Sequence, residues 1–191
     1  MCSDYRLLER VPVEEQFPNL LHPEGIPNFE PRVDIRITDR APILRAAADR
    51  QGAVELVQRR WSWPGPSGKP VYNFRADGRD FPHGRCVILA DGFYEFTAHS
   101  DPKSKRKHKW LFTLAGEPWF GIAGLWRSDG AVGEAFTMLT CEPCADVAPY
   151  HGRSIVVLPP AAWGRWLDPA NPSAAFTGPL PAGSFAVEQV A

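Results

Sequence analysis

The sequence predicts a β-rich fold in a single domain over residues 1–191, with few helices and an antiparallel sheet that curls or closes. Its 191 residues are enough for one sizeable core but short for two ordinary domains. Twenty prolines and sixteen glycines divide the chain into short segments, which favours strands and turns over long helices. Several segments are apolar, rich in β-branched or aromatic residues, and separated by short turn-like stretches, as expected for neighbouring antiparallel strands.

The apolar segments place the individual elements. We expect strands at residues 33–38, 85–89, 110–114, 120–125, 135–140 and 154–158. Alanines and leucines at roughly helical spacing predict a surface helix over 40–56, and the prolines that open 160–167 suit the first turn of a second one. The basic run 103–109 lies between a strand ending near Phe96 and one beginning at Trp110, so we expect a hairpin loop there.

The charge balance does not indicate a generally basic nucleic-acid-binding domain, because 21 basic and 22 acidic residues give a formal net charge of −1. Any affinity for DNA must therefore come from a local patch. No apolar stretch approaches the roughly 20 residues that cross a bilayer, and the N-terminus lacks the features of a secretory signal. We expect a monomer in the cytoplasm, associated with the nucleoid.

The cysteines predict free thiols rather than a disulfide framework. Four are few for a secreted scaffold, and a reducing compartment keeps them reduced. Cys141 and Cys144 have the spacing of a redox or metal pair, but zinc requires a second ligand pair with similar spacing, which the sequence lacks. We expect neither a metal nor a cofactor.

Among the candidate residues, Cys2 points most specifically to one kind of chemistry. Removal of Met1 would leave an α-amine and a thiol on adjacent carbons, which is a 1,2-aminothiol. An α-amine with a pKa of about 7.7 to 8.0 is partly unprotonated near neutral pH and can attack an aldehyde. The thiol can then close a five-membered thiazolidine ring, an intramolecular step with a large effective molarity. The alternative is an accidental cysteine after the start codon, and retention of Met1 would block the amine chemistry.

Other polar residues in apolar or turn-prone segments could assist this chemistry. Glu95 lies among aromatic residues, where desolvation raises a carboxyl pKa toward that of a general acid or base, unless it points to solvent on an edge strand. His151 precedes an apolar strand and could donate a proton, or be a structural histidine. Asn73 and Arg75 share one face if extended and could hold a sugar hydroxyl and a phosphate, or form a turn.

Taken in order, several motifs resemble the SRAP family (SOS response-associated peptidase, also called abasic-site processing proteins). The resemblance covers nearly the whole chain, and its most specific blocks are 84–96 and 147–158. The motifs are the initial Met1-Cys2, the tryptophan-containing segment 60–64, Asn73 with Arg75, the block Gly84 to Phe96, the segments 123–126 and 136–140, and Val147 to Arg153 leading into 154–158.

The resemblance implies a mixed α+β domain on a curved, mostly antiparallel, barrel-like sheet, with a basic cleft for single-stranded DNA. It implies a sensor of abasic sites in DNA damage and the SOS response, which forms a covalent thiazolidine cross-link through the amine and thiol at the N-terminus. Lyase-like and autopeptidase activities would accompany it. The implied catalytic residues are Cys2 as nucleophile, Asn73 as positioner, Glu95 as acid or base and His151 as proton donor. The implied DNA contacts are Arg6, Arg75, Arg153 and Trp61.

The chain departs from the family pattern at three points. The usual Met-Cys-Gly-Arg start is Met1-Cys2-Ser3-Asp4 here, so we expect Arg6 to replace a lost phosphate contact. Phe74 and Asp77 alter the Asn-Ala-Arg-x-Glu pattern, and residues 64–66 replace the usual aromatic wedge after Trp63. Two alternatives remain open: a cysteine peptidase that releases its own Met1, and a DNA-binding module without chemistry.

Overall fold

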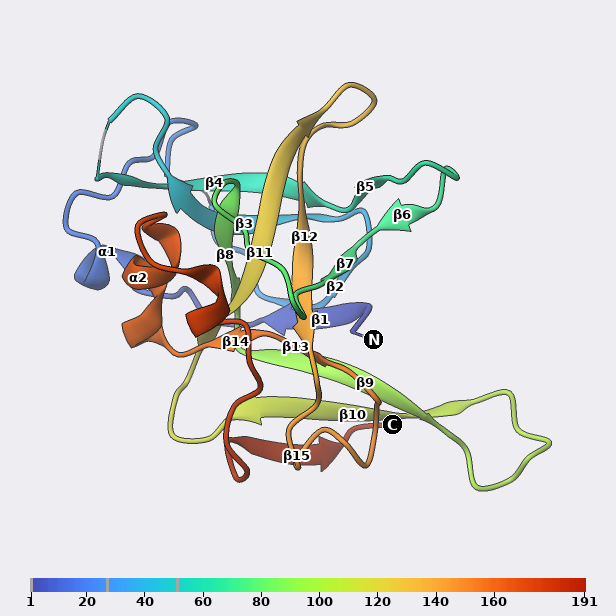
Figure 1. The fold of residues 1–191 in the computed structure, drawn as a ribbon. Coiled ribbons are helices and arrows are strands. Elements are labelled where there is room, and N and C mark those ends of the chain that lie inside the picture. The colour runs from blue at the N-terminus through green and yellow to red at the C-terminus, as the bar shows by residue number, and fades with distance from the viewer. Residues whose placement is uncertain (1, 27, 51) are drawn as a thin grey trace.

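A closed five-stranded barrel forms the centre of the computed structural model, which describes residues 2–26, 28–50 and 52–191. The ring runs β12-β4-β3-β8-β11 and closes through pairing of β11 with β12 (Figure 1). All of its pairs are antiparallel except β12 with β4. The barrel strands are β3 (Arg40–Ala46), β4 (Val54–Trp61), β8 (Arg85–Ala90), β11 (Phe120–Asp129) and β12 (Gly133–Cys141).

A second, antiparallel sheet lies against one end of the barrel, below it in Figure 1. Its strand order is β15-β10-β9-β1-β2, so the N-terminal strand is paired on both sides. Only Asp91 separates β8 from β9, and the chain therefore passes directly from the barrel into this sheet. The strands are β1 (Asp4–Leu7), β2 (Arg32–Arg36), β9 (Gly92–Ala98), β10 (Lys107–Leu114) and β15 (Phe185–Gln189).

Short strands extend the edges of β11 and β12. Along β12, one side pairs first with β11 and then with β13 (Ser154–Ile155). The other side pairs in parallel first with β4 and then with β7 (Asn73–Arg75). The strand β14 (Val157–Leu158) pairs with β11, and β5 (Trp63–Pro64) forms a small hairpin with β6 (Pro70–Val71). Thus β12 touches four other strands, two of which carry predicted site residues or border them.

The helices are short and peripheral (Figure 1). They are α1 (Val13–Gln16), the 3-10 helix η1 (Pro160–Ala162), α2 (Trp163–Leu167) and the 3-10 helix η2 (Ser173–Ala175). Within α2, Trp163 and Trp166 are fully buried, and the Trp166 indole N–H donates to the Cys86 carbonyl of β8 at 2.8 Å. The second predicted helix is therefore confirmed, and its buried side packs against β8. None of the helices in the described part of the chain has the length and apolar character that crossing a bilayer requires.

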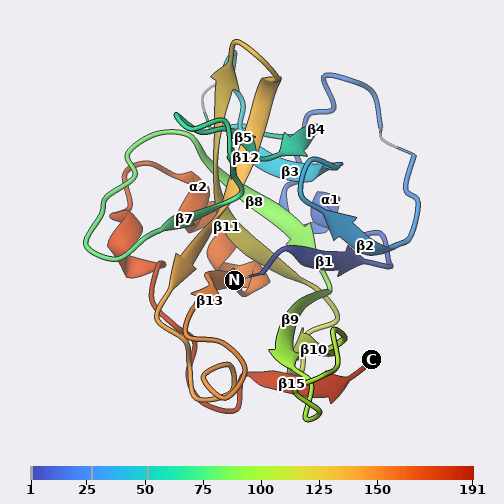
Figure 2. The same cartoon turned by 90° about the vertical axis from the view of Figure 1, so that its right-hand side faces the viewer.

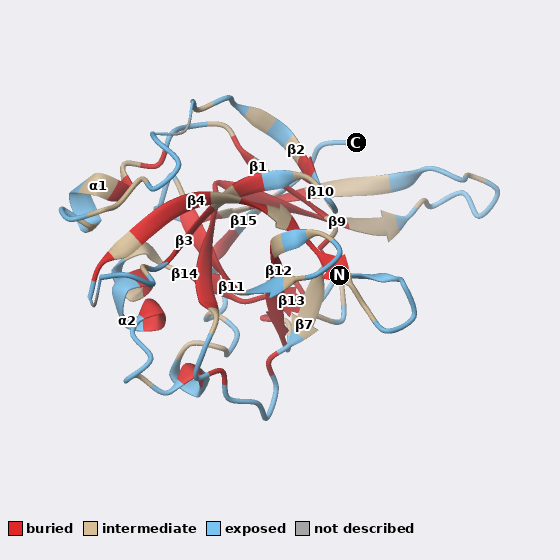
Figure 3. Ribbon diagram, turned by 90° about the horizontal axis from the view of Figure 1, so that it is seen from above, coloured by how far each residue is buried: buried red, intermediate tan, exposed pale blue. Residues whose placement is uncertain are grey.

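One hydrophobic cluster joins the barrel and the second sheet. Every residue of β8 is buried, and Figure 3 shows the buried residues concentrated in the strands while the connecting loops are exposed. In the second sheet, Phe93 and Phe112 stack with ring centroids 4.9 Å apart, and both contact Phe185. The packing confirms the predicted α+β fold with a mostly antiparallel, barrel-like sheet and few peripheral helices.

The predicted helix over 40–56 is wrong. This segment forms β3 and the beginning of β4, which pair in antiparallel register through Ile43 with Val57 and Leu44 with Leu56. The strand β3 also pairs with β8 on its other side, so it is a central strand with a nearly continuous buried run. Such a run cannot be distinguished from a buried helix by periodicity alone, and closure of the barrel decides the outcome.

The other predicted elements are confirmed with shifted ends. The predicted strand 154–158 is two strands, β13 and β14, because the Val156 N–H donates to Leu139 on β12 while the Val156 carbonyl accepts from Ala123 on β11. The segment thus crosses from one barrel strand to the next. The basic run 103–109 lies in the β9–β10 hairpin, and its last three residues already belong to β10.

Gly84 lies in the turn just before β8, and its substitution tests how closely this turn packs against the barrel. Its φ is +71°, and an added Cβ would lie 2.7 Å from the Trp126 carbonyl oxygen. We expect Gly84→Ala to lower the free energy of unfolding by about 2 to 4 kcal/mol, because left-handed strain and a backbone clash add together. Gly78→Ala is the matched control: its φ is +67° but no atom lies within 4 Å of the added Cβ, so we expect a loss of only about 1 kcal/mol. Equal losses in urea denaturation would contradict the clash.

Candidate active site

Cys2 lies immediately before β1 and is almost fully buried, with 1% of its surface exposed. Pairing of Tyr5 with Phe93 and Ile35 fixes β1 between β9 and β2, which holds the start of the chain against the sheet. The Cys2 thiol donates to the Asp4 carbonyl at 3.2 Å. Burial raises the pKa of this thiol well above its usual range, and the negative charge of Glu95 adds to the rise. The sulfur is therefore a neutral thiol at physiological pH.

Asn73 binds the same N-terminal segment from the opposite side. The parallel pairing of Asn73 with Met138 fixes β7 beside β12, and the Asn73 side-chain N–H donates to the Cys2 carbonyl at 2.8 Å. Its side-chain oxygen is buried and has no hydrogen-bond partner among the described residues. Asn73 thus positions Cys2 and keeps one acceptor available beside it.

Glu95 projects from the middle of β9, where it pairs across the ladder with Trp110. Only 2% of the residue is exposed. Burial raises the pKa of the Glu95 carboxyl to about 7, and the positive charge at the N-terminus opposes that rise. A carboxyl with this pKa populates both protonation states near neutral pH, as a group that both accepts and donates protons must.

His151 ends the turn that follows β12. Its Nδ1 lies 2.9 Å from the Arg153 backbone nitrogen and 3.1 Å from the Arg153 carbonyl oxygen, so it accepts from the first in one neutral tautomer and donates to the second in the other. Burial and the positive charge at the N-terminus lower the pKa of His151 below its usual value. The imidazole is therefore mostly neutral at physiological pH.

The structure brings these four predicted residues together. The Asn73 side chain donates to the Cys2 carbonyl at 2.8 Å, and the negative charge of Glu95 raises the pKa of the Cys2 thiol. Tyr150, next to His151, contacts Trp110 with ring centroids 4.7 Å apart, and Trp110 is the cross-strand partner of Glu95. Figures 2 and 3 both show the start of β1 among β7, β9 and β13. A thiol, a side-chain amide, a carboxyl and an imidazole thus gather around the start of β1.

The predicted arginine contacts differ in their surroundings. Arg153 forms ion pairs with Asp77 and, at 2.9 Å, with Glu142, and it also donates to the Thr140 carbonyl at 3.0 Å. Arg6 forms an ion pair with Asp91 at 2.6 Å. Arg75 is exposed at the end of β7 and forms no ion pair within the described part of the chain. A phosphate could bind Arg75 directly but would have to displace carboxylates from the other two.

Trp61, which the resemblance implies as a DNA contact, is buried. None of its surface is accessible, and its indole N–H donates to the Tyr72 carbonyl at 2.9 Å. The Tyr5 and Tyr72 rings contact it edge-on, with centroids 5.3 and 6.2 Å away. Trp61 therefore packs beneath Tyr5 of β1 and Tyr72, the residue before β7. It has no face available to stack on a base.

An ion cluster beside Cys2 was not predicted. The Lys109 ammonium lies 2.8 Å from Asp4 and 2.6 Å from Asp34, and it also covers the Tyr94 ring at 3.7 Å. Burial raises the pKa of the Asp4 carboxyl, and Lys109 opposes the rise. Lys109 belongs to the basic run 103–109 that is predicted as a hairpin loop, and the register of β10 turns it toward Asp4. The position that is arginine in the family pattern is thus a carboxylate that anchors β1.

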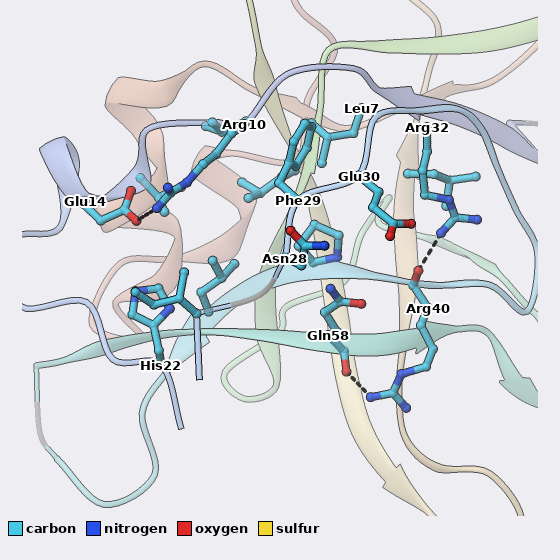
Figure 4. A pocket seen from close by; sticks show the side chains of 17 residues that line it. Leu7, Arg10, Glu14, His22, Asn28, Phe29, Glu30, Arg32, Arg40 and Gln58 are labelled. Atoms are coloured by element: carbon cyan, nitrogen blue, oxygen red, sulfur yellow. Dashed lines mark hydrogen bonds and ion pairs between the residues drawn. The ribbon is translucent and has the colours of Figure 1, made fainter. Parts of the chain in front are cut away.

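A cavity of about 240 Å³ lies elsewhere, between α1, β2, β3 and β4 (Figure 4). None of the four predicted catalytic residues lines it. Its guanidinium groups are engaged: Arg10 with Glu14, Arg32 with Asp39 at 2.6 Å, and Arg40 with the Gln58 carbonyl at 2.6 Å. No group of three or more potential metal ligands occurs among the residues described, and Cys141 and Cys144 are both buried free thiols.

Glu95 should give the stability of the protein a distinct pH dependence. Its folded pKa of about 7 exceeds the ordinary value of 4.5. The carboxyl therefore contributes stability that is fully present below pH 4.5 and is lost as the pH rises through about 7. We expect Glu95→Gln to flatten the decline of unfolding free energy across this window, measured by urea denaturation at a series of pH values. Parallel wild-type and variant curves would contradict a raised pKa.

Comparison with known families and structures gives a consistent assignment. The model of the family described as SOS response associated peptidase (SRAP) matches residues 1–191, the whole chain. No match was found among curated proteins.

Three crystal structures share the fold. A protein from Bordetella bronchiseptica is 24% identical with a TM-score of 0.71, and the match covers 100% of both chains. A phage-related protein from the same organism is 24% identical with a TM-score of 0.69, covering 99% of this chain and 94% of that one. A protein from Bacteroides thetaiotaomicron is 16% identical with a TM-score of 0.65, covering 83% and 78%.

Proposed function

Because the chain belongs to the SOS response associated peptidase (SRAP) family, a family associated with DNA damage, we propose that it captures abasic sites in single-stranded DNA through Cys2. The observation that supports this most directly is the convergence of Asn73, Glu95 and His151 on the start of the chain. An abasic nucleotide in its ring-opened form carries an aldehyde, which the α-amine and thiol of Cys2 can bind jointly once Met1 is removed.

The reaction proceeds in two bond-forming steps. The Cys2 amine attacks the aldehyde carbon, and loss of one water gives an imine. The Cys2 sulfur then bonds to the same carbon while the thiol proton passes to the nitrogen, which yields a thiazolidine with no further leaving group. The thiol is held neutral by burial and by Glu95, so ring closure requires a nearby group that accepts its proton.

The surrounding side chains have separable roles in this proposal. Asn73 holds the Cys2 carbonyl and so orients the amine toward the substrate. Glu95, with a pKa of about 7, first donates a proton to the departing hydroxyl as the imine forms, and then, as a carboxylate, accepts the thiol proton and passes it to the nitrogen as the ring closes. The neutral His151 donates a hydrogen bond from its ring N–H to the deoxyribose ring oxygen and assists opening of the sugar.

The DNA backbone would bind first at Arg75, whose guanidinium is exposed. Arg153 and Arg6 are held by carboxylates, so they would contact phosphates only by exchanging these partners. Phosphate contacts position the strand without reading its sequence. The proposed substrate is therefore single-stranded DNA with an abasic site in any sequence context.

Incubation with an abasic single-stranded oligonucleotide tests the proposal. We expect an adduct that survives heating in denaturant and high salt, and none with the undamaged oligonucleotide. Electrostatic contacts are screened by salt whereas covalent bonds are not. Binding that high salt reverses completely would instead indicate a DNA-binding module without chemistry.

A cysteine peptidase is the second reading, in which the Cys2 thiol attacks an amide. The raised pKa of that thiol disfavours the thiolate which such an attack requires. Mass spectrometry of protein expressed in cells lacking methionine aminopeptidase activity separates the two. Absence of Met1 in that protein would favour self-processing, whereas its retention would argue against it.

A further inference from the structure

One face of the β9–β10 hairpin continues outward from Glu95. The antiparallel register pairs Glu95 with Trp110 and Thr97 with His108, so these four side chains project from the same face of the sheet. The Trp110 indole N–H donates to the Thr97 hydroxyl at 2.8 Å, which fixes the indole along this face. The hairpin thus connects the candidate active site to its own protruding end.

A row of partly exposed rings lies along this face. Tyr150, next to His151, contacts Trp110 with centroids 4.7 Å apart. Trp110 is followed by His108 at 6.3 Å, and His108 stacks on His99 at 4.8 Å with an interplanar angle of 21°. All four rings are half-buried rather than covered. The row therefore leads from the active-site turn to the base of the hairpin loop.

Cations cluster where the row ends. Lys103, Lys105, Arg106 and Lys107 are exposed and form no ion pair within the described residues. The only carboxylate in the loop is Asp101, which accepts the Lys103 backbone N–H at 2.9 Å. Figures 1 and 3 show this loop extending beyond the body of the protein. In a chain of net charge −1, these residues form a local positive patch.

We propose that this surface, the hairpin track, binds the single-stranded DNA that flanks the captured nucleotide. The track comprises the rings of His99, His108, Trp110 and Tyr150 and the cations of loop residues 103–107. Every nucleobase has a face that stacks on aromatic rings, and each phosphate is attracted to a nearby cation, so alternating rings and cations fit an unpaired strand. Because the row ends at Tyr150, a strand that follows it enters the site beside His151.

This inference rests on the proposed function for its orientation toward the active site, but its test does not require cross-linking. The probe is a fluorescein-labelled thymidine oligonucleotide without an abasic site, and fluorescence anisotropy measures its Kd at several salt concentrations. The test variant changes Lys103, Lys105 and Arg106 to glutamine. The matched control likewise changes three exposed cations outside the track, Arg50, Lys69 and Arg165, to glutamine. It therefore removes the same charge.

We expect the track variant to weaken binding about tenfold or more and to reduce the slope of log Kd against log salt by about 2, since each phosphate contact on a single strand contributes about 0.7. The control should change Kd by less than about twofold. Equal losses in both variants, an unchanged Kd in the track variant, or no binding by the wild type would overturn the proposal. Absence of an abasic-site adduct alongside these expected results would contradict only the proposed function.

The rings are tested separately from the charges. We expect the double substitution His99→Ala and His108→Ala to raise Kd about fivefold or more while leaving the salt slope unchanged, because stacking is not an ionic contact. An unchanged thermal unfolding midpoint checks that the hairpin still folds. Loss of binding accompanied by a reduced salt slope, or no loss at all in a folded variant, would show that bases do not stack on this row.

Discussion

Replacing the Cys2 thiol is expected to abolish the heat-stable adduct while leaving an imine. In Cys2→Ala the α-amine remains after Met1 removal, so it can still condense with the aldehyde, but no sulfur is present to close the ring. Imines hydrolyse on heating, whereas an intramolecular ring forms with a large effective-molarity advantage. We expect at least about a 100-fold loss of heat-stable adduct on a denaturing gel.

Reduction with borohydride supplies the control. It converts an imine to a stable amine, so Cys2→Ala should again give an adduct when borohydride is present during the reaction. Buried Cys86, Cys141 and Cys144 are retained in the variant, which excludes them as the source of any adduct that disappears. An undiminished heat-stable adduct in Cys2→Ala without borohydride would rule out the thiazolidine mechanism.

Loss of the Glu95 carboxyl should give the second large effect. Its burial and its pKa of about 7 suit a group that moves protons to and from the reacting atoms. We expect Glu95→Gln to slow adduct formation by about 100-fold to 10,000-fold, the usual contribution of a general acid–base group. The measurement is the initial rate of adduct formation at saturating oligonucleotide.

The pH dependence of the rate of adduct formation distinguishes a catalytic role of Glu95 from a structural one. The wild-type rate should change near pH 7 as Glu95 titrates, whereas the Glu95→Gln profile should lack that transition. Glu142→Gln is a useful control, because it removes an exposed carboxylate that pairs with Arg153 rather than one in contact with the N-terminal segment. A Glu95→Gln rate within a few-fold of wild type would assign the carboxyl to packing alone.

Local chemistry singled out Cys2, Asn73, Glu95 and His151 as candidates from the sequence, and the structure places them close together. Each is a reactive or polar residue in a segment whose extended or turn-prone character is readable from its neighbours. The β-rich class was equally accessible, since prolines and glycines leave little room for long helices. The resemblance to a family then placed these segments in one site.

Features set by long-range pairing could not be predicted. The segment 40–56 reads as a helix because the partners that make β3 a central strand, β4 and β8, are not visible in its own periodicity. The burial of Trp61, an implied DNA contact, could not be predicted because it comes from Tyr5 and Tyr72, which lie far from one another in the sequence. Lys109 is predicted to lie in a hairpin loop, and only the register of β10 directs it to Asp4.

The fourfold pairing of β12 has a consequence for motion. Its two sides bond to β11 and β13 and to β4 and β7, so the barrel wall and the strand that carries Asn73 share one set of backbone hydrogen bonds. Amide protons of β12 should then exchange with deuterated solvent only when the entire domain opens. A captured nucleotide would accordingly lie against a rigid strand, and local opening of the hairpin loops would not release it.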